Sequence, residues 1–321
     1  MASPTPSPQD VFAKNRAEEL GYDVWENFVI PPFFDRLSLG GTRKPKVIVG
    51  GRGCGKTMLL RYLSHDSMFS PRRPAISPDA KSHIGLYWRA DTQFAQLMAG
   101  RGLEDDIWHG AFRHLSAVSL GKEVLRSLQS ISSSTAGFAT EDEITKADFS
   151  RLHSFDEDLP STYRELLRSL EDRVDAFETW VNDVRNIPRP RFLPGEAFLA
   201  RLVDVVHSEF AGLRDTEFFV YIDEYENLTT YQQRIINTWL KHSEPPLIFN
   251  LAMKRNGFKT RLTTGDESLS HIHDYREFDL EKYDLEWEFP VFAAEILLLN
   301  MVLAGYKDVD LGITMPPFQG D

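Results

Sequence analysis

Short strand-like runs alternate with longer segments of helical periodicity along most of the chain. The clearest run is Val47, Ile48 and Val49, three β-branched residues that are too few for a helix face and suit a buried parallel strand. Further strands are predicted at 83–91, 218–224, 247–252 and 271–280. The alternation predicts an α/β fold whose five-stranded sheet is mainly parallel.

The middle of the chain, from about 92 to 212, has helical periodicity. Residues 112–131 have apolar positions three and four apart, and residues 161–186 carry a longer apolar stripe. A helix over that second range would be about 40 Å long, longer than the crossover helices of a compact nucleotide-binding core. Residues 132–150 are polar and predict a mobile linker between the two helices. We therefore expect a helical insertion that offers a surface to a partner.

Changes in composition divide the chain into five segments. We expect an N-terminal lead-in with a short helix over 1–20, and the first part of the α/β core over 21–99. The helical insertion is expected over 100–194, the second part of the core over 195–285, and a partial lid or C-terminal helix over 286–321. These boundaries follow Pro-rich and polar breaks in the sequence.

The charge and cysteine content limit the partners and the setting. The 321 residues include 48 Asp and Glu against 36 Lys and Arg, a net charge of -12, so a protein that coats nucleic acid in general is not expected. Cys54 is the single cysteine, which leaves no internal disulfide. The N-terminus lacks the features of a signal peptide, and the apolar stretch 289–305 is too short to span a membrane. We expect a cytoplasmic protein without membrane contact.

The stretch after the first predicted strand fits the phosphate-loop pattern G-x-x-x-x-G-K-[ST]. Glycines allow the backbone to wrap an anion, and the helix that follows directs N–H groups at the phosphates. Lys56 is expected to reach the β- and γ-phosphates, and the Thr57 hydroxyl is expected to ligate Mg²⁺. The alternative is an ordinary glycine-rich turn. The nucleotide contacts are expected from Gly50, Gly51, Arg52, Gly53, Cys54, Gly55, Lys56, Thr57 and Met58.

The run FFVYIDE at 218–224 ends in the acidic pair that phosphate-loop ATPases place beside the loop. Asp223 is expected to hold Mg²⁺, and Glu224 is expected to polarise the attacking water as a catalytic base. Residues 83–91 form a strand without such a pair and lie between the two motifs. That order is typical of additional-strand ATPases rather than nucleotide kinases.

Weaker candidates lie at three other places. Val29 and Ile30 belong to a segment before the loop that could form the adenine wall or simply pack in the core. Asn250, in the fourth strand, is a candidate sensor of the γ-phosphate. Lys254, Arg255, Lys259 and Arg261 form a basic cluster with three possible roles: a solvated loop, an arginine finger for a neighbouring subunit, or contacts to nucleic-acid phosphates. Arg255 and Arg261 are the catalytic candidates among them.

GGRGCGKTMLLRYLS and IDEYENLTTYQQRIINTWLK resemble segments of the bacterial origin-recognition-complex-like AAA+ ATPases, a group related to the signalling (STAND) P-loop ATPases. The resemblance covers roughly 25–65 and 215–285. It implies that Lys56, Thr57, Asp223 and Glu224 carry the nucleotide and hydrolysis roles, with ATP and Mg²⁺ as cofactors. Between Glu286 and Tyr306 there is no arginine or lysine, which indicates a reduced or truncated lid.

These observations favour an ATP-binding and ATP-hydrolysing switch or assembly ATPase. It would work as a homo-oligomer or with an effector protein through the helical insertion, in a setting such as antiviral defence or a mobile element. One alternative is an initiator-like ATPase that handles DNA, a partner that the acidic balance does not favour. Another is a nucleotide-bound scaffold without turnover.

Overall fold

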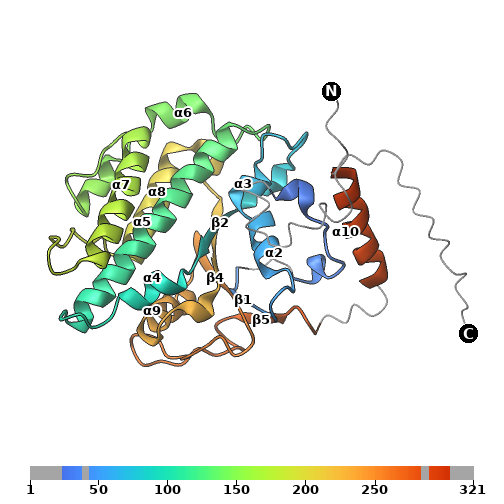
Figure 1. The fold of residues 1–321 in the computed structure, drawn as a ribbon. Helices are drawn as coiled ribbons and strands as arrows, with labels where there is room; N and C mark the ends of the chain where they lie inside the picture. Colours follow the sequence, from blue (N-terminus) through green and yellow to red (C-terminus); the bar gives the residue numbers. More distant parts are fainter. Residues whose placement is uncertain (1–23, 38–42, 283–288, 304–321) are drawn as a thin grey trace, which may run out of the picture.

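The computed structural model describes residues 24–37, 43–282 and 289–303. A parallel sheet of five strands lies at the centre, with helices on both faces (Figure 1). The strands are β1 (Lys46–Val49), β2 (His83–Arg89), β3 (Glu217–Asp223), β4 (Leu247–Met253) and β5 (Arg276–Asp279). Every paired neighbour runs parallel, in the order β2-β3-β4-β1-β5. The predicted five-stranded α/β fold is confirmed.

This order brings the two predicted motifs to one edge of the sheet. Val49 at the end of β1 pairs with Met253 at the end of β4, and Asp223 at the end of β3 pairs with Arg89 of β2. One strand, β4, separates β1 from β3, so the two ends lie roughly 10 Å apart at a strand spacing of about 4.8 Å. The loop after β1 and the acids after β3 therefore face each other across the carboxyl end of β4.

One face of the sheet is covered by α2 (Lys56–Tyr62) and by the segment that precedes β1. Leu59 and Leu60 of α2 pack with Ile48 and Tyr221 of the sheet in one apolar cluster. The apolar side chains of each strand alternate between this cluster and the larger one on the other face. This alternation explains why β3 and β4 are apolar on nearly every position: both of their faces are buried.

The other face is covered by a thick helical layer that forms the left half of Figure 1. Trp108 of α5 (Asp105–Ser132) lies 5.6 Å from Trp180 of α7 (Tyr163–Asn182), ring centre to ring centre. Both are buried in the core that also contains the sheet residues Leu86 and Val220. The predicted insertion thus shares one hydrophobic core with the sheet. The helices of this side are α4 (Thr92–Leu97), α5 (Asp105–Ser132), α6 (Glu141–Lys146), α7 (Tyr163–Asn182), α8 (Glu196–Glu209) and α9 (Thr230–Lys241).

Two predictions about this layer were wrong in detail. The range 132–150, predicted as a mobile linker, contains α6, which begins with a capping box between Thr140 and Glu143. Ile144 and Phe149 from the same range are buried, so packing holds this polar stretch in place. The helix predicted over 161–186 is α7, whose 20 residues make it about 30 Å long.

The remaining elements are short or peripheral. Helix α3 (His65–Met68) follows α2, and α10 (Phe289–Leu303) lies at the edge of the molecule in Figure 1. The lead-in predicted over 1–20, and most of the lid predicted over 286–321, lie outside the described residues. Among the helices that the structure describes, none has the length and apolar character needed to cross a membrane. Short 3-10 helices occur at Trp25–Asn27, Phe34–Leu37, Pro78–Ser82, Ser150–Ser154, Ala211–Leu213 and Tyr225–Asn227.

Candidate nucleotide site

The loop between β1 and α2 has the open backbone that a phosphate group requires. Gly53 and Gly55 adopt left-handed conformations, with φ of 86° and 88°. A Cβ built at either position would meet no described atom within 4 Å, so the space around these two glycines is free. A side chain there would strain the backbone and enter that space. The loop therefore fits an anion bound by main-chain amides.

Lys56 lies across the mouth of this loop. Its ammonium donates hydrogen bonds to the carbonyl oxygens of Gly50 at 2.7 Å and Gly51 at 2.8 Å. The same nitrogen lies 3.5 Å from the Cys54 sulfur. The positive charge is thus held where a triphosphate would enter, bonded only to neutral loop atoms that a phosphate oxygen can replace.

The loop and the acidic strand meet through Thr57 and Asp223. The Thr57 hydroxyl donates to Asp223 Oδ2 at 2.7 Å, and the Tyr87 hydroxyl donates to the same oxygen at 3.1 Å. Burial raises the pKa of Asp223 above its ordinary value, although hydrogen bonds from Thr57, the Glu224 amide and Tyr87 oppose this rise. A cation beside this carboxylate would favour its charged form.

The oxygens of Thr57 and Asp223 fit a magnesium ion. Mg²⁺ prefers oxygen ligands, and it is usually held by one or two protein groups together with phosphates and water. Within the described residues there is no group of three or more His, Cys, Asp or Glu side chains that could hold a metal by themselves. Thr57 and Asp223 supply two oxygens, a donor set that suits a cation bound together with phosphates and water.

Glu224, the predicted catalytic base, is held by two neighbours. Its backbone is left-handed, with φ of 53°, a conformation that residues other than glycine seldom adopt. Its carboxylate lies 3.0 Å from Nη2 of Arg89 and accepts a hydrogen bond from Asn227 at 2.8 Å. Asn227 also donates to the carbonyl oxygen of Ala90 at 3.1 Å. The residues at the end of β2 thus hold Glu224 in place.

A second carboxylate contacts the loop from the end of β5. Glu281 accepts a hydrogen bond from the Gly51 amide at 2.6 Å, and its other oxygen lies 2.7 Å from Arg255. Arg255 also pairs with Asp279 at 3.1 Å. Among the basic residues proposed from the sequence, Arg255 is therefore connected to the loop through Glu281.

The structure places two predicted residues away from the loop. Asn250 is buried inside the sheet, where its side chain accepts from the Lys46 amide at 3.0 Å and donates to the Val220 carbonyl at 3.3 Å. It completes backbone hydrogen bonds in mid-strand and does not reach the carboxyl edge. Arg261 bonds to the Tyr275 hydroxyl and lies over the ring of Phe258. Neither side chain contacts the nucleotide loop.

The segment with Val29 and Ile30 lies beside α2. Phe28 stacks on Tyr62 of α2 with ring centres 4.1 Å apart. Val29 is half-buried and the Ile30 side chain is exposed. Arg52 is also exposed, and Met58 is half-buried in α2. An adenine wall at Val29 and Ile30 stays a prediction.

Sequence reasoning missed Tyr87, Arg89, Asn227 and Glu281. A signal for two of them was present, because residues 83–91 were assigned to a strand of the same parallel sheet as the acidic strand. Strands of one parallel sheet end at the same edge, which places Tyr87 and Arg89 at the edge that holds Asp223 and Glu224, and the pairing of β2 with β3 in the structure brings them together. Glu281 carried no such signal, because its contact with Gly51 joins parts of the chain 230 positions apart.

Comparison with known proteins gives a family for the chain. The ORC-CDC6-like family model matches residues 10–318, which includes the helical layer as well as the two motifs. The match is wider than the two segments whose resemblance was visible in the sequence. No curated protein and no solved structure gives a significant match. With the motifs brought together at one edge of a sheet in the order 2-3-4-1-5, the chain belongs to the ORC-CDC6-like family of AAA+ ATPases.

Proposed function

We propose that the protein binds ATP with Mg²⁺, hydrolyses it slowly, and acts as a switch for a partner. The observation that carries the proposal is the 2.7 Å contact between the Thr57 hydroxyl and Asp223. It brings a residue of the phosphate loop and a residue of the acidic strand, 166 positions apart, to one point. Two such motifs meet at one point when they serve one ligand.

Each residue at the carboxyl edge has a role in this proposal. The Lys56 ammonium leaves the loop carbonyls and binds the β- and γ-phosphates. Thr57 and Asp223 hold the magnesium ion, which neutralises phosphate charge when bound. Glu224 orients the water that attacks the γ-phosphate. The Arg89 guanidinium beside this carboxylate weakens its interaction with the attacking water, and this pairing accounts for slow turnover.

The partner is the least constrained part of the proposal. The helical layer buries one side of α7 and exposes residues such as Asp172, Asp175 and Glu178 on the other, which leaves a surface for an effector or a second copy. Cytoplasmic location belongs to the same proposal. A role in antiviral defence, and a relation to bacterial signalling ATPases, are hypotheses that rest on the family resemblance alone.

A scaffold that binds nucleotide without turnover is the second candidate. The pairing of Glu224 with Arg89 and Asn227 favours it, because the carboxylate is engaged on both of its oxygens. The DNA-handling alternative gains no such support. Lys254 pairs with Glu226, Lys259 bonds to the Leu228 carbonyl, and Arg255 and Arg261 have the partners described above.

Glu224→Gln separates the two candidates. A switch with turnover predicts phosphate release by the wild type, loss of release in Glu224→Gln, and ATP retained by that variant after gel filtration. A scaffold predicts retained ATP and no release in either protein. Lys56→Ala serves as the control that removes nucleotide binding. Phosphate release by Lys56→Ala at the wild-type rate would contradict the proposal.

A further inference from the structure

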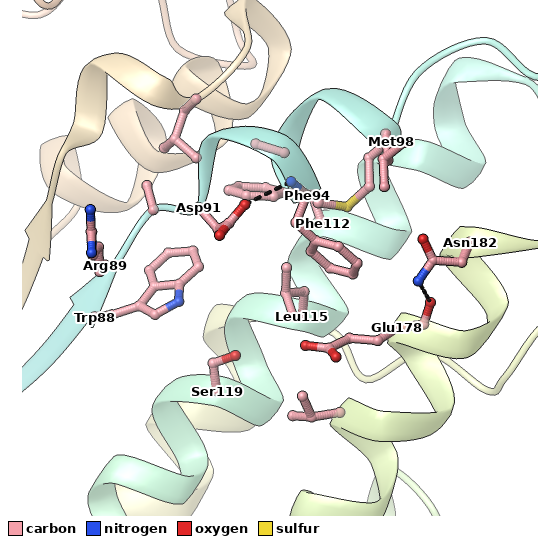
Figure 2. Close-up of a pocket in the computed structure, with 15 residues that line it drawn as sticks. Trp88, Arg89, Asp91, Phe94, Met98, Phe112, Leu115, Ser119, Glu178 and Asn182 are labelled. Carbon is pink, nitrogen blue, oxygen red and sulfur yellow. Dashed lines mark hydrogen bonds between the residues drawn. The ribbon is translucent and has the colours of Figure 1, made fainter.

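A cavity of about 410 Å³ lies beside the nucleotide site, where β2 ends and α4 begins. Its volume is within the range of about 300–1,000 Å³ that ligand pockets occupy. Figure 2 shows the Trp88 indole on the β2 side and the Glu178 side chain on the α7 side, with Leu115 and Ser119 of α5 between them. The cavity opens on the surface that the helical layer shares with the end of β2.

The walls of this cavity are aromatic and negatively charged. Trp88 and Phe94 provide two half-buried aromatic rings, Phe112 is buried beside Trp88, and Asp91 and Glu178 provide two carboxylates. Neither carboxylate forms an ion pair with any residue in the described part of the chain. Asp91 is a helix cap, because its Oδ1 accepts from the Phe94 amide at 2.8 Å. Asp175, three positions before Glu178 on α7, is exposed and adds negative charge near the opening.

The cation that lines the cavity is directed elsewhere. Arg89 follows Trp88 on β2, so the two side chains leave the strand on opposite faces of the sheet. Its guanidinium lies 3.0 Å from Glu224. The cavity therefore presents aromatic faces and uncompensated carboxylates, the two features that bind a cation with a flat apolar surface.

We propose that this cavity binds an arginine side chain presented by a basic segment of a partner protein. A guanidinium can stack on the Trp88 indole and pair with a carboxylate of the wall, Asp91 or Glu178, whereas an ammonium cannot make the planar stack. Several residues of the wall are exposed, including Leu97, Glu178 and Asn182. The cavity is therefore open enough for a side chain of another protein to enter. The net charge of -12 attracts a basic partner surface.

The position of the cavity gives this contact a consequence for the proposed ATPase. Arg89 lines the cavity and holds Glu224, so the two sites share one residue. A second guanidinium would occupy the carboxylates that could draw Arg89 away from Glu224, and it would repel Arg89 toward Glu224. Both effects keep the Glu224 carboxylate paired with Arg89. A bound partner therefore prolongs the ATP-bound state, a consequence that rests on the proposed function.

The test measures binding separately from hydrolysis. The probe is the peptide acetyl-Gly-Arg-Gly-amide, and its matched neutral control carries citrulline in place of arginine. Binding is followed by ¹⁹F NMR of the protein labelled with 5-fluorotryptophan, with the Trp88 signal assigned by Trp88→Phe. We expect a Kd of about 1 mM for the arginine peptide, since one side chain supplies the contact, and no saturable shift with citrulline.

Variants locate the contact and decide the outcome. The double variant Asp91→Asn, Glu178→Gln keeps a capping group at position 91 and is expected to weaken binding about tenfold. Asp175→Asn, which removes a charge outside the cavity, is expected to change binding by less than about twofold. Equal binding to the double variant and the wild type, or no binding to the wild type, overturns the proposal. If free agmatine binds and the peptide does not, the proposal that the occupant belongs to a partner protein is wrong.

Lys56→Ala distinguishes this inference from the proposed function. The variant is expected to lose ATP and to bind the peptide as the wild type does. In the wild type, saturating peptide is expected to lower kcat for ATP several-fold. If the wild type binds the peptide and releases no phosphate, the turnover fails and the cavity assignment stands. If kcat rises with peptide, the stated coupling is wrong.

Discussion

The carboxyl edge of the sheet and the helical layer around α5 are held together by different forces. At the edge, charged and polar side chains such as Thr57, Asp223 and Glu281 contact one another through single hydrogen bonds. In the layer, large apolar side chains such as Trp108 and Trp180 are buried in a core shared with the sheet. Hydrogen bonds at an open edge contribute little to folding, and buried aromatic rings contribute much. Changes at the edge should therefore alter nucleotide binding, and changes in the layer should alter stability.

Trp180→Ala should have the largest effect on stability. The indole of Trp180 is almost fully buried between Trp108, Phe177 and Phe192, so truncation leaves a large cavity. We expect a loss of about 3–5 kcal/mol in the free energy of unfolding, measured by urea denaturation. The exposed residue Asp172, changed to Ala on the same helix, should cost less than about 0.5 kcal/mol. A loss below about 1 kcal/mol for Trp180→Ala would contradict a shared core.

A buried pair between α3 and the helical layer should give a pH-dependent contribution of intermediate size. His65 of α3 lies 3.2 Å from Glu123 of α5. Burial by itself lowers the pKa of His65, but the hydrogen bond to Glu123 and the charges of Asp66 and Glu123 outweigh it, so the pKa is raised above 6.5. Burial likewise opposes ionisation of Glu123, but the bond to His65 keeps its pKa below 4.5.

The sign of the pH effect follows from these two shifts. The folded state binds the His65 proton more tightly than the unfolded chain, so the stability gained is complete below pH 6.5 and is lost as the pH rises through the raised pKa. The Glu123 contribution is lost as the pH falls below 4.5. The His65 contribution to the melting temperature should therefore decline from about pH 6.5 upward, and it should appear as a wild-type advantage over Glu123→Gln that shrinks as the pH rises. Asp142→Asn, at an exposed pair with Lys146, should leave it unchanged. If the melting temperature of Glu123→Gln declines with pH as steeply as that of the wild type, the pH dependence arises from other groups.

Glu281→Gln should have the smallest effect and should act on nucleotide binding alone. The carboxylate contacts Gly51 and pairs with Arg255, so the change removes one negative charge from the loop mouth and leaves Arg255 paired with Asp279 alone. We expect the Kd for Mg-ATP to fall about two- to fivefold, measured by calorimetry, with little change in melting temperature. Glu277→Gln removes the same charge from an exposed position on β5 and serves as the control. Weaker ATP binding in Glu281→Gln would show that the carboxylate supports the loop.

The same two regions differ in how far the sequence predicted them. Lys56, Thr57, Asp223 and Glu224 lie in short motifs and the strands have clear apolar patterns, so the α/β fold and the meeting of the two motifs could be predicted, whereas the order of the strands was found only in the structure. The chemical roles of these residues stay predictions. The contacts of Arg89 and Glu281 depend on which strand ends lie next to each other at the edge of the sheet. The local sequence pattern carries little of that information.

The helical layer was predicted less well for a related reason. Residues 132–150 are polar enough to predict a linker, yet α6 is held by Ile144 and by its capping box.

Asn250 of β4 was expected near the phosphate because of its polarity, but its position in mid-strand makes its amide a partner of backbone groups. In both cases tertiary packing decided the structure, and composition alone could not.

Alkylation of Cys54 tests the central claim most directly, because this single thiol lies inside the phosphate loop. The measurement is the rate of iodoacetamide modification with and without saturating Mg-ATP, in the wild type and in Lys56→Ala. We predict that Mg-ATP slows modification of the wild type at least tenfold and does not slow modification of Lys56→Ala. An unchanged rate in a wild type that calorimetry shows to be saturated with ATP would place the nucleotide elsewhere and contradict the account.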